Sequence, residues 1–362
     1  MINPKCFTLD WIQEKRSELK AVDPGILEKS IHALALLGHL ADSELDFVFK
    51  GGTSLLLHLS PIRRLSIDID IVCGAPANDL ERVLNKISSL PPFNKVEPDE
   101  RGNRGLPKRR HFKFFYNQIP GGHPAPFVLL DVVEESEYHL PLIEKPIITE
   151  FLEVDQEVQV KLPTVEGLLG DKLTAFAPNT IGVPFQTPKG VSQTMQVVKQ
   201  LFDIGELFNF ADDTSSVSSA YQASFEKESL YRGNESSKED TLNDTIESSR
   251  LLCGFGVRGF REDGIISSYF KEGTTKLNNH LVNSKFRLPI EAKVAAAKAG
   301  YLAGMIMAGK PDVSFSETRF KQDNLAILKD IDLQDELSGL NRLKAVNPEA
   351  FHYWWKMQET RG

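Results

Sequence analysis

The sequence predicts an α/β or α+β domain followed by a mostly helical half. Helical and strand patterns alternate over roughly the first 160 residues, as they do in α/β and α+β folds. After Pro163 the apolar spacing becomes helical. Because a domain averages about 150 residues, the 362-residue chain is expected to form two domains, at residues 1–162 and 163–362.

Caps, apolar spacing and chain breakers define the elements of the first domain. Asp23-Pro24 places a cap before a proline at the first helical position. Gly51-Gly52 ends a strand, and Thr53 is expected to cap the helix that follows. In chain order, the predicted elements are two helices within the first forty residues, the second running from Pro24 through Leu37, a strand at Phe47–Phe49, a helix at Leu55–Leu59, a strand at Leu65–Val72, a helix at Asn78–Leu90 and strands at His111–Tyr116, Phe127–Val133 and Glu157–Lys161.

The second half is expected to contain helices at Thr164–Ala177, Thr194–Phe210 and Glu291–Ala308, where apolar residues recur at helical spacing. Between Ala211 and Ser249 the chain is rich in Ser, Asp and Glu and poor in large apolar side chains. This composition is typical of a solvated helix or a mobile insertion rather than of a core. The helical domain is therefore expected to carry a polar insertion near residues 211–249.

Composition excludes several classes of protein. Lys and Arg total 42 against 50 Asp and Glu, for a net charge of −8, so a polyanionic partner has to be held by a local patch. Cys6, Cys73 and Cys253 are far apart, which argues against a disulfide scaffold or a zinc finger and favours a reducing cytosol. The N-terminus lacks a signal-peptide pattern, and no apolar run is long enough to span a membrane. We expect a cytoplasmic protein without membrane contact.

The strand Leu65–Val72 carries the main chemical signal. Alternate strand residues share a face, so Ser66, Asp68 and Asp70 project to one side, where the Ser66 hydroxyl is expected to hydrogen-bond a phosphate oxygen of the nucleotide. Two carboxylates about 6–7 Å apart repel each other, by on the order of 3 kcal/mol at an effective dielectric of about 20. A hard divalent cation such as Mg²⁺, or Mn²⁺, turns this repulsion into ligation. The alternative is a solvent-facing strand with an acidic outer face.

A glycine turn precedes this strand. Gly51-Gly52 followed by a helix start at Thr53 would offer backbone N–H groups to an anion; a plain tight turn is the alternative. A phosphate cradle and metal-binding acids within about twenty residues are what transfer from a nucleoside triphosphate requires. Asp131, in the strand Phe127–Val133, is the candidate third acid, which would bridge metals and accept a proton. Its alternative is a strand-end acid facing water.

Two further groups of residues are candidates. In the helical half, Lys172 flanks an apolar helix face from which it could reach phosphates, and Asp203 lies on the next predicted helix; surface ion pairs are the alternative for both. The second group is a basic cluster interleaved with aromatic residues, which suggests contact with an RNA backbone or a solubilising hairpin tip. Its candidate RNA-binding residues are Arg104, Lys108, Arg109 and Arg110.

Taken together, these motifs resemble the AbiEii family of nucleotidyltransferase toxins. The resemblance spans roughly residues 45–210, and it rests on the order of four segments: Lys50–Ser54, Arg64–Asp70, Asp171–Leu173 and Lys199–Leu207. It implies a DNA-polymerase-β-like nucleotidyltransferase lobe, with a mixed sheet and flanking helices, followed by a helical lobe. It also implies Mg²⁺-dependent transfer from NTP, tRNA ends as the acceptor in some members, and a cognate antitoxin, often in abortive phage defence.

The resemblance also implies roles for individual residues. Asp68 and Asp70 would hold metal, Gly52 and Thr53 would cradle phosphate, Lys172 would contact the triphosphate, and Asp203 would be the catalytic acid of the second lobe. The chain departs from the family at Lys199, where arginine is expected, and after Ala211. We expect a nucleotidyltransferase acting on an RNA end; a protein or small-molecule acceptor, and a non-catalytic NTP-binding regulator, remain alternatives.

Overall fold

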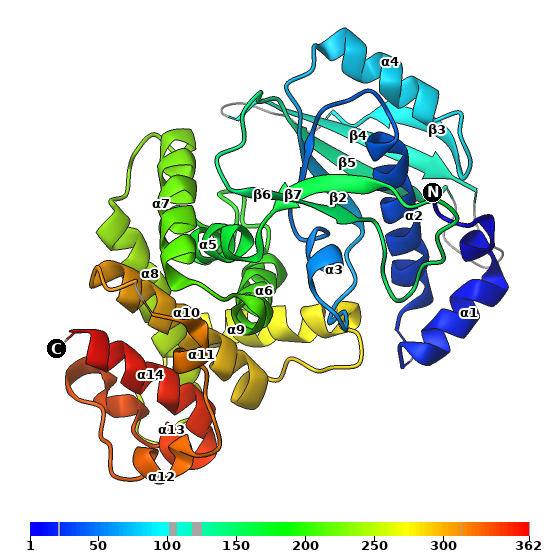
Figure 1. The fold of residues 1–362 in the computed structure, drawn as a ribbon. Coiled ribbons are helices and arrows are strands. Elements are labelled where there is room, and N and C mark those ends of the chain that lie inside the picture. The colour runs from blue at the N-terminus through cyan, green and yellow to red at the C-terminus, as the bar shows by residue number, and fades with distance from the viewer. Residues whose placement is uncertain (21, 101–106, 118–124, 312, 362) are drawn as a thin grey trace. The chain divides into compact units, whose positions relative to one another are not determined.

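The computed structural model describes the chain except residues 21, 101–106, 118–124, 312 and 362, and it contains two compact units (Figure 1). Unit 1 comprises Met1–Thr164 and Asn279–Ser284. Unit 2 comprises Val165–Asn278 and Lys285–Gly362. The short segment Asn279–Ser284 therefore belongs with residues more than a hundred positions earlier in the chain, which the expected division at 162/163 did not anticipate.

Unit 1 is a mixed α/β fold, as predicted. Strands β3 and β6 were missing from the predicted elements. In chain order, its helices and strands are a 3₁₀ turn at Pro4–Phe7, α1 (Leu9–Glu18), α2 (Pro24–Ala41), β1 (Val48–Lys50), α3 (Leu55–His58), β2 (Asp68–Val72), α4 (Ala77–Ile87), β3 (Phe93–Pro98), β4 (Arg109–Tyr116), β5 (Phe127–Val133), β6 (Leu142–Pro146) and β7 (Gln159–Pro163).

Five strands form one sheet in the order β1-β2-β5-β4-β3, and β6 and β7 form a separate antiparallel hairpin (Figure 1). Within the five-stranded sheet, β2 and β5 run parallel and the other pairs are antiparallel. Helix α2 contacts β2 and β5. Its start is capped as expected, because the Asp23 carboxylate accepts a hydrogen bond from the Ile26 amide. Ile69 and Leu130 share the core with the apolar face of α2.

Unit 2 is built mainly from helices. Helix α5 contacts α6 and α7, and α10 contacts α6, α8 and α14. In chain order, the elements are α5 (Val165–Ala175), α6 (Thr194–Phe210), α7 (Thr214–Tyr231), α8 (Lys238–Gly254), α9 (Gly264–Leu277), a 3₁₀ turn at Asn278–His280, a π-helical turn at Leu288–Ala292, α10 (Lys293–Met307), α11 (Phe315–Thr318), α12 (Asn324–Leu328), a 3₁₀ turn at Asp335–Leu340, α13 (Leu343–Val346) and α14 (Pro348–Arg361).

The polar stretch 211–249 differs from the expected insertion. It forms α7 and most of α8, and both helices pack into unit 2. A Cβ on Gly170 of α5 would lie 2.6 Å from the backbone nitrogen of Tyr221, so α5 and α7 approach backbone to backbone. The buried Thr245 donates its hydroxyl hydrogen to a backbone carbonyl, which lets a small polar residue occupy a core position. Low apolar content therefore did not indicate exposure here.

The returning segment Asn279–Ser284 docks beside the start of β2. The Leu65 amide donates to the His280 carbonyl over 2.8 Å, and the Val282 amide donates to the Arg63 carbonyl over 2.8 Å. The side chain of Val282 is fully buried in the core of unit 1. Residues 63–65 are thus held by a segment that follows α9 in the chain.

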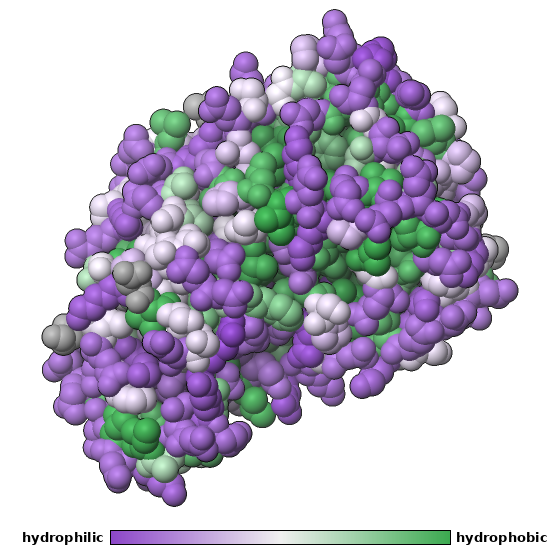
Figure 2. Space-filling model, viewed as in Figure 1, coloured by the Kyte–Doolittle hydropathy of each residue, from purple (hydrophilic) through white to green (hydrophobic). Residues whose placement is uncertain are grey.

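The surface is mostly hydrophilic on the face shown in Figure 2, with apolar residues in small groups. Within the described part of the chain, no helix combines the length and the apolar character needed to cross a membrane.

Candidate active site

The three acids predicted on strands lie on one face of the sheet. Strand β2 runs parallel to β5, with Asp68 opposite Leu129 and Asp70 opposite Asp131. Because residues paired on neighbouring strands point to the same face, Asp131 shares the face of Asp70, and strand alternation places Asp68 there too. All three acids are half-buried. The intervening Ile69 is fully buried.

The sheet register places Asp70 and Asp131 in the middle of a row of four side chains across four strands, called the acidic row below: Lys50, Asp70, Asp131 and His111. Lys50 of β1 lies opposite Asp70, and His111 of β4 lies opposite Asp131. His111 Nδ1 is 2.6 Å from Asp131 Oδ1. The two neighbouring carboxylates are therefore flanked by a lysine on one side and a hydrogen-bond donor on the other. Sequence analysis assigned His111 no role, because its partner Asp131 is 20 positions away.

The glycine turn lies directly against Asp70. Gly51 has a φ of +74°, and a Cβ there would lie 2.1 Å from Asp70 Oδ2. Glycine is therefore required for two reasons, the left-handed backbone and the space that the Asp70 carboxylate occupies. The turn and the acidic strand form one local structure.

The prediction that Thr53 caps the next helix is wrong. The N-cap is Ser54, whose hydroxyl donates to the Gly51 carbonyl over 2.7 Å, and α3 has only four residues. A single turn has little macrodipole, so only backbone amides of the glycine turn remain as anion donors. The buried Thr53 hydroxyl lies 2.8 Å from the Ser66 hydroxyl and also contacts the Asp68 carbonyl. These two side chains tie the turn to β2.

A buried arginine braces the same turn. The Arg64 guanidinium, 4% exposed, donates to the Gly52 carbonyl over 3.1 Å. The Arg64 backbone also forms a bridge with Leu281 of the returning segment. Sequence analysis assigned Arg64 no role, although it opens the segment that carries the two aspartates.

In unit 2, Lys172 and Asp203 form a buried ion pair between α5 and α6. Lys172 Nζ lies 3.3 Å from Asp203 Oδ2, and the side chains are 7% and 0% exposed. Gln200 accepts a second hydrogen bond from Lys172 Nζ at 2.8 Å. The alternative of surface ion pairs is therefore wrong for both residues. Because Asp203 is fully buried, it cannot contact a substrate directly in this structure.

The basic cluster on β4 is partly neutralised. Arg110 pairs with Glu81 and with Glu134. Lys108 and Arg109 are exposed, and Arg104 lies outside the described residues. The neighbouring aromatic residues on β4 follow the hairpin alternative in part, because Phe112, Phe114 and Tyr116 alternate into the core.

The carboxylates fit a metal held jointly with a substrate. Among the described residues, no group of three or more His, Cys, Asp and Glu side chains is arranged to hold a metal ion. Mg²⁺, however, is usually bound by one or two carboxylates together with substrate phosphates and water. Asp68 and Asp70 supply hard oxygen ligands from one face of β2, which matches that mode of binding. One oxygen of Asp131 is already bonded to His111.

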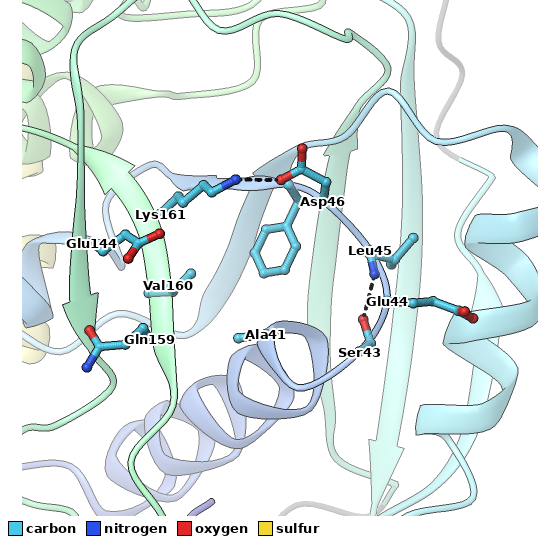
Figure 3. Close-up of a pocket in the computed structure, with 10 residues that line it drawn as sticks. Ala41, Ser43, Glu44, Leu45, Asp46, Glu144, Gln159, Val160 and Lys161 are labelled. Carbon is cyan, nitrogen blue, oxygen red and sulfur yellow. Dashed lines mark hydrogen bonds and ion pairs between the residues drawn. The ribbon is translucent and has the colours of Figure 1, made fainter.

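A pocket of about 260 Å³ lies elsewhere in unit 1 (Figure 3). It is lined by the loop before β1 and by the β6–β7 hairpin, where Lys161 Nζ pairs with Asp46 Oδ1 at 2.9 Å. This loop leads into the first residue of β1, whereas Gly51 and the acidic row lie at the last residue of that strand. The pocket is therefore separate from the acidic row. Its lining includes Glu44 and Glu144 as well. This excess of carboxylates would repel a triphosphate, so the pocket is not the nucleotide site.

A mixed sheet with paired acids beside a glycine turn is a nucleotidyltransferase-type fold. The chain matches the family model described as "Nucleotidyl transferase AbiEii toxin, Type IV TA system" over residues 35–259. It belongs to this family, as the sequence resemblance indicated, and is a toxin nucleotidyltransferase. A type IV toxin–antitoxin family implies an NTP substrate and an antitoxin partner.

Three solved structures from other organisms are similar to this chain. MenT4, a nucleotidyltransferase toxin from Mycobacterium tuberculosis, is 12% identical, with coverage of 96% of this chain and 98% of that chain and a TM-score of 0.49. JHP933 and a putative nucleotidyltransferase, both from Helicobacter pylori, are each 15% identical over 78% of this chain and 94% of theirs, with TM-scores of 0.43 and 0.39. No curated protein sequence matches the chain.

Proposed function

We propose that this nucleotidyltransferase uses Mg²⁺ to transfer a nucleotide from an NTP to the end of an RNA, with tRNA as the acceptor. The observation that supports this most strongly is the row in which Asp70 and Asp131 are direct neighbours, with Asp68 on the same face and the glycine turn against Asp70. Adjacent carboxylates repel each other, and a divalent cation bound between them would turn this repulsion into ligation.

In this proposal, Asp68 and Asp70 hold the metal, with Mn²⁺ as a substitute, and Asp131 completes the site. The bound cation would neutralise triphosphate charge and favour ionisation of the acceptor hydroxyl. Asp131 is the base that receives the hydroxyl proton. Backbone amides at Gly51 and Gly52 hold phosphate oxygens.

Ser66 and Thr53 serve nucleotide binding indirectly in this proposal. Their hydroxyls contact each other and are buried, so they fix the shape of the glycine turn. This replaces the direct phosphate contact expected from the sequence.

Lys172 is proposed to contact the triphosphate as a point charge. Its support is the position of the Asp171–Leu173 segment among the family motifs. Asp203 and Gln200 then orient the ammonium group. Asp203 is a positioning residue in this account, rather than the catalytic acid that the family resemblance implied.

The acceptor assignment rests on the family resemblance and on the exposed Lys108 and Arg109, which can follow a phosphate backbone. We propose that the reaction takes place in the cytoplasm, where NTPs and tRNA are available, under the control of a cognate antitoxin and in defence against phage.

Incubation of the purified protein with Mg²⁺, total tRNA and each α-labelled NTP in turn tests the acceptor and identifies the nucleotide. Asp70→Asn removes one charge at the site, and Asp46→Asn is its matched control, since Asp46 is an exposed aspartate of the same unit. Label in RNA with the wild type and Asp46→Asn alone is the expected result. Label that enters protein or a small molecule instead would replace the RNA proposal, and NTP binding without transfer would indicate a non-catalytic regulator.

A further inference from the structure

His111 is the member of the acidic row to which neither the sequence nor the family motifs assign a role. It lies on β4, directly opposite Asp131 of β5 in an antiparallel register. Its Nδ1 is 2.6 Å from Asp131 Oδ1, and the two side chains are 13% and 27% exposed. A carboxylate oxygen accepts hydrogen bonds, so the His111 Nδ1–H group is the donor and Asp131 Oδ1 is the acceptor.

This hydrogen bond limits how the Asp131 carboxylate can rotate. The terminal torsion of an aspartate side chain is broad and roughly two-fold, so an unrestrained carboxylate beside Asp70 would turn away from its like-charged neighbour. With Oδ1 bonded to His111, the orientation of Oδ2 is set as well. One oxygen is occupied by the protein, and the other is left for a ligand.

A purely structural role explains the pair less well. Strands β4 and β5 are already joined along seven paired positions, from Arg109 opposite Val133 to Phe115 opposite Phe127. The backbone ladder therefore holds the strands together without help from His111.

We propose that His111 is a positioning residue of the active site, which orients Asp131 through Oδ1 so that Oδ2 faces the metal or the acceptor hydroxyl. The inference rests on the function proposed above. It assigns His111 no role as an acid or a base: its contribution is the Nδ1–H donor alone. Hydrogen bonds of this kind to metal-binding groups typically change metal affinity or activity by about 10- to 100-fold.

Two substitutions separate the donor from the rest of the ring. His111→Leu removes the donor, whereas His111→Asn keeps an N–H close to the position of Nδ1 and cannot titrate. His39→Leu is the matched control, because the His39 ring also bonds one protein oxygen, the Pro91 carbonyl at 2.9 Å, on the unrelated helix α2. The variants are compared as full-length proteins by thermal unfolding, by steady-state kinetics and by Mn²⁺ binding in the presence of a non-hydrolysable NTP analogue.

We expect His111→Leu to lower kcat by about 10- to 100-fold and to weaken Mn²⁺ binding by a similar factor, with the KM for NTP changed by less than about threefold. His111→Asn should recover most of both losses. His39→Leu should match the wild type in kcat and in Mn²⁺ affinity.

Wild-type kcat and Mn²⁺ affinity in His111→Leu would overturn the inference. Equal losses in His111→Leu and His111→Asn, accompanied by equal falls in Tm, would also overturn it and make the pair a structural tie. If the wild type binds Mn²⁺ but transfers no nucleotide, the proposed function fails, and the Mn²⁺ affinities of the two variants still decide the role of His111. If the wild type binds no Mn²⁺, the metal assignment and the inference are both wrong.

Discussion

The carboxylate of Asp203 is fully buried, and its Oδ2 atom lies 3.3 Å from Lys172 Nζ. A buried charge is stable only while its partner is present, because neither group can regain its hydration. The ion pair therefore stabilises one packing arrangement of α5 against α6 and holds the lysine ammonium group in a fixed position.

Removal of one partner should destabilise the protein more than removal of both. Asp203→Leu leaves a buried lysine charge and should lower the free energy of unfolding by about 3–5 kcal/mol. The double variant Lys172→Met/Asp203→Leu should recover most of this loss, although it should be inactive. Urea denaturation of the wild type, Asp203→Leu, Lys172→Met and the double variant measures the coupling. Losses that simply add in the double variant would show that the two residues do not interact.

Gly51 should be essential for activity because of Asp70 rather than because of its backbone alone. Gly51→Ala puts a Cβ where Asp70 Oδ2 now lies, 2.1 Å from the ideal position, and should reduce transfer by more than about 100-fold. Left-handed backbone costs a non-glycine residue roughly 1–2 kcal/mol. Gly190 provides the control, because it has a φ of +75° with no atom within 4 Å of its Cβ position.

Gly190→Ala should lose only the backbone contribution, and therefore less stability than Gly51→Ala in thermal unfolding, and it should keep wild-type activity. Equal activities of the two alanine variants would mean that the turn does not need to approach Asp70.

Stability should fall between pH 6.5 and 4 because of two buried histidines in unit 1. Burial lowers the pKa of His32 to about 4, and burial together with Lys145 lowers the pKa of His58 to about 4. In the unfolded chain these groups take up protons below about pH 6.5, whereas the folded state excludes the protons until about pH 4. Acid thus favours unfolding, by about 2 kcal/mol per histidine at pH 5 relative to pH 7.

His58→Gln should remove about half of this pH dependence, since the glutamine amide can still donate to the Pro163 carbonyl that His58 Nε2 contacts. Urea unfolding at pH 7 and pH 5 makes the comparison. An unchanged difference between the two pH values in His58→Gln would contradict the assignment.

The exposed basic residues should act on RNA alone. Lys108→Ala/Arg109→Ala should raise the KM for tRNA severalfold and leave the KM for NTP unchanged. If both side chains contact phosphates, the slope of log affinity against log salt should become shallower by about 1.4–1.8. Arg110→Ala should have a smaller effect, because Arg110 is already paired with Glu81 and Glu134. Equal changes in both KM values would contradict an RNA-specific role.

Local patterns predicted the parts of the fold that depend on local chemistry. The shared face of Asp68 and Asp70 follows from strand alternation, and the glycine turn follows from backbone freedom at Gly51. The family resemblance correctly indicated the class of enzyme.

The relationships that sequence reasoning missed depend on pairing between distant segments. The bond between His111 and Asp131 depends on the register between β4 and β5, which local residue patterns do not fix. The burial of Asp203 depends on α5 packing against α6. The helices of residues 211–249 were read as polar surface, because small hydroxyl side chains in close helix contacts resemble solvated residues in composition.

The most direct test of the account is the release of pyrophosphate from NTP by the wild type, Asp70→Asn and Asp46→Asn, with Mg²⁺ and tRNA present and again after chelation. The account predicts that pyrophosphate release requires Mg²⁺, falls at least about 100-fold in Asp70→Asn and is unchanged in Asp46→Asn. Undiminished release in Asp70→Asn, with normal folding of the variant, would contradict the assignment of the acidic row as the catalytic site.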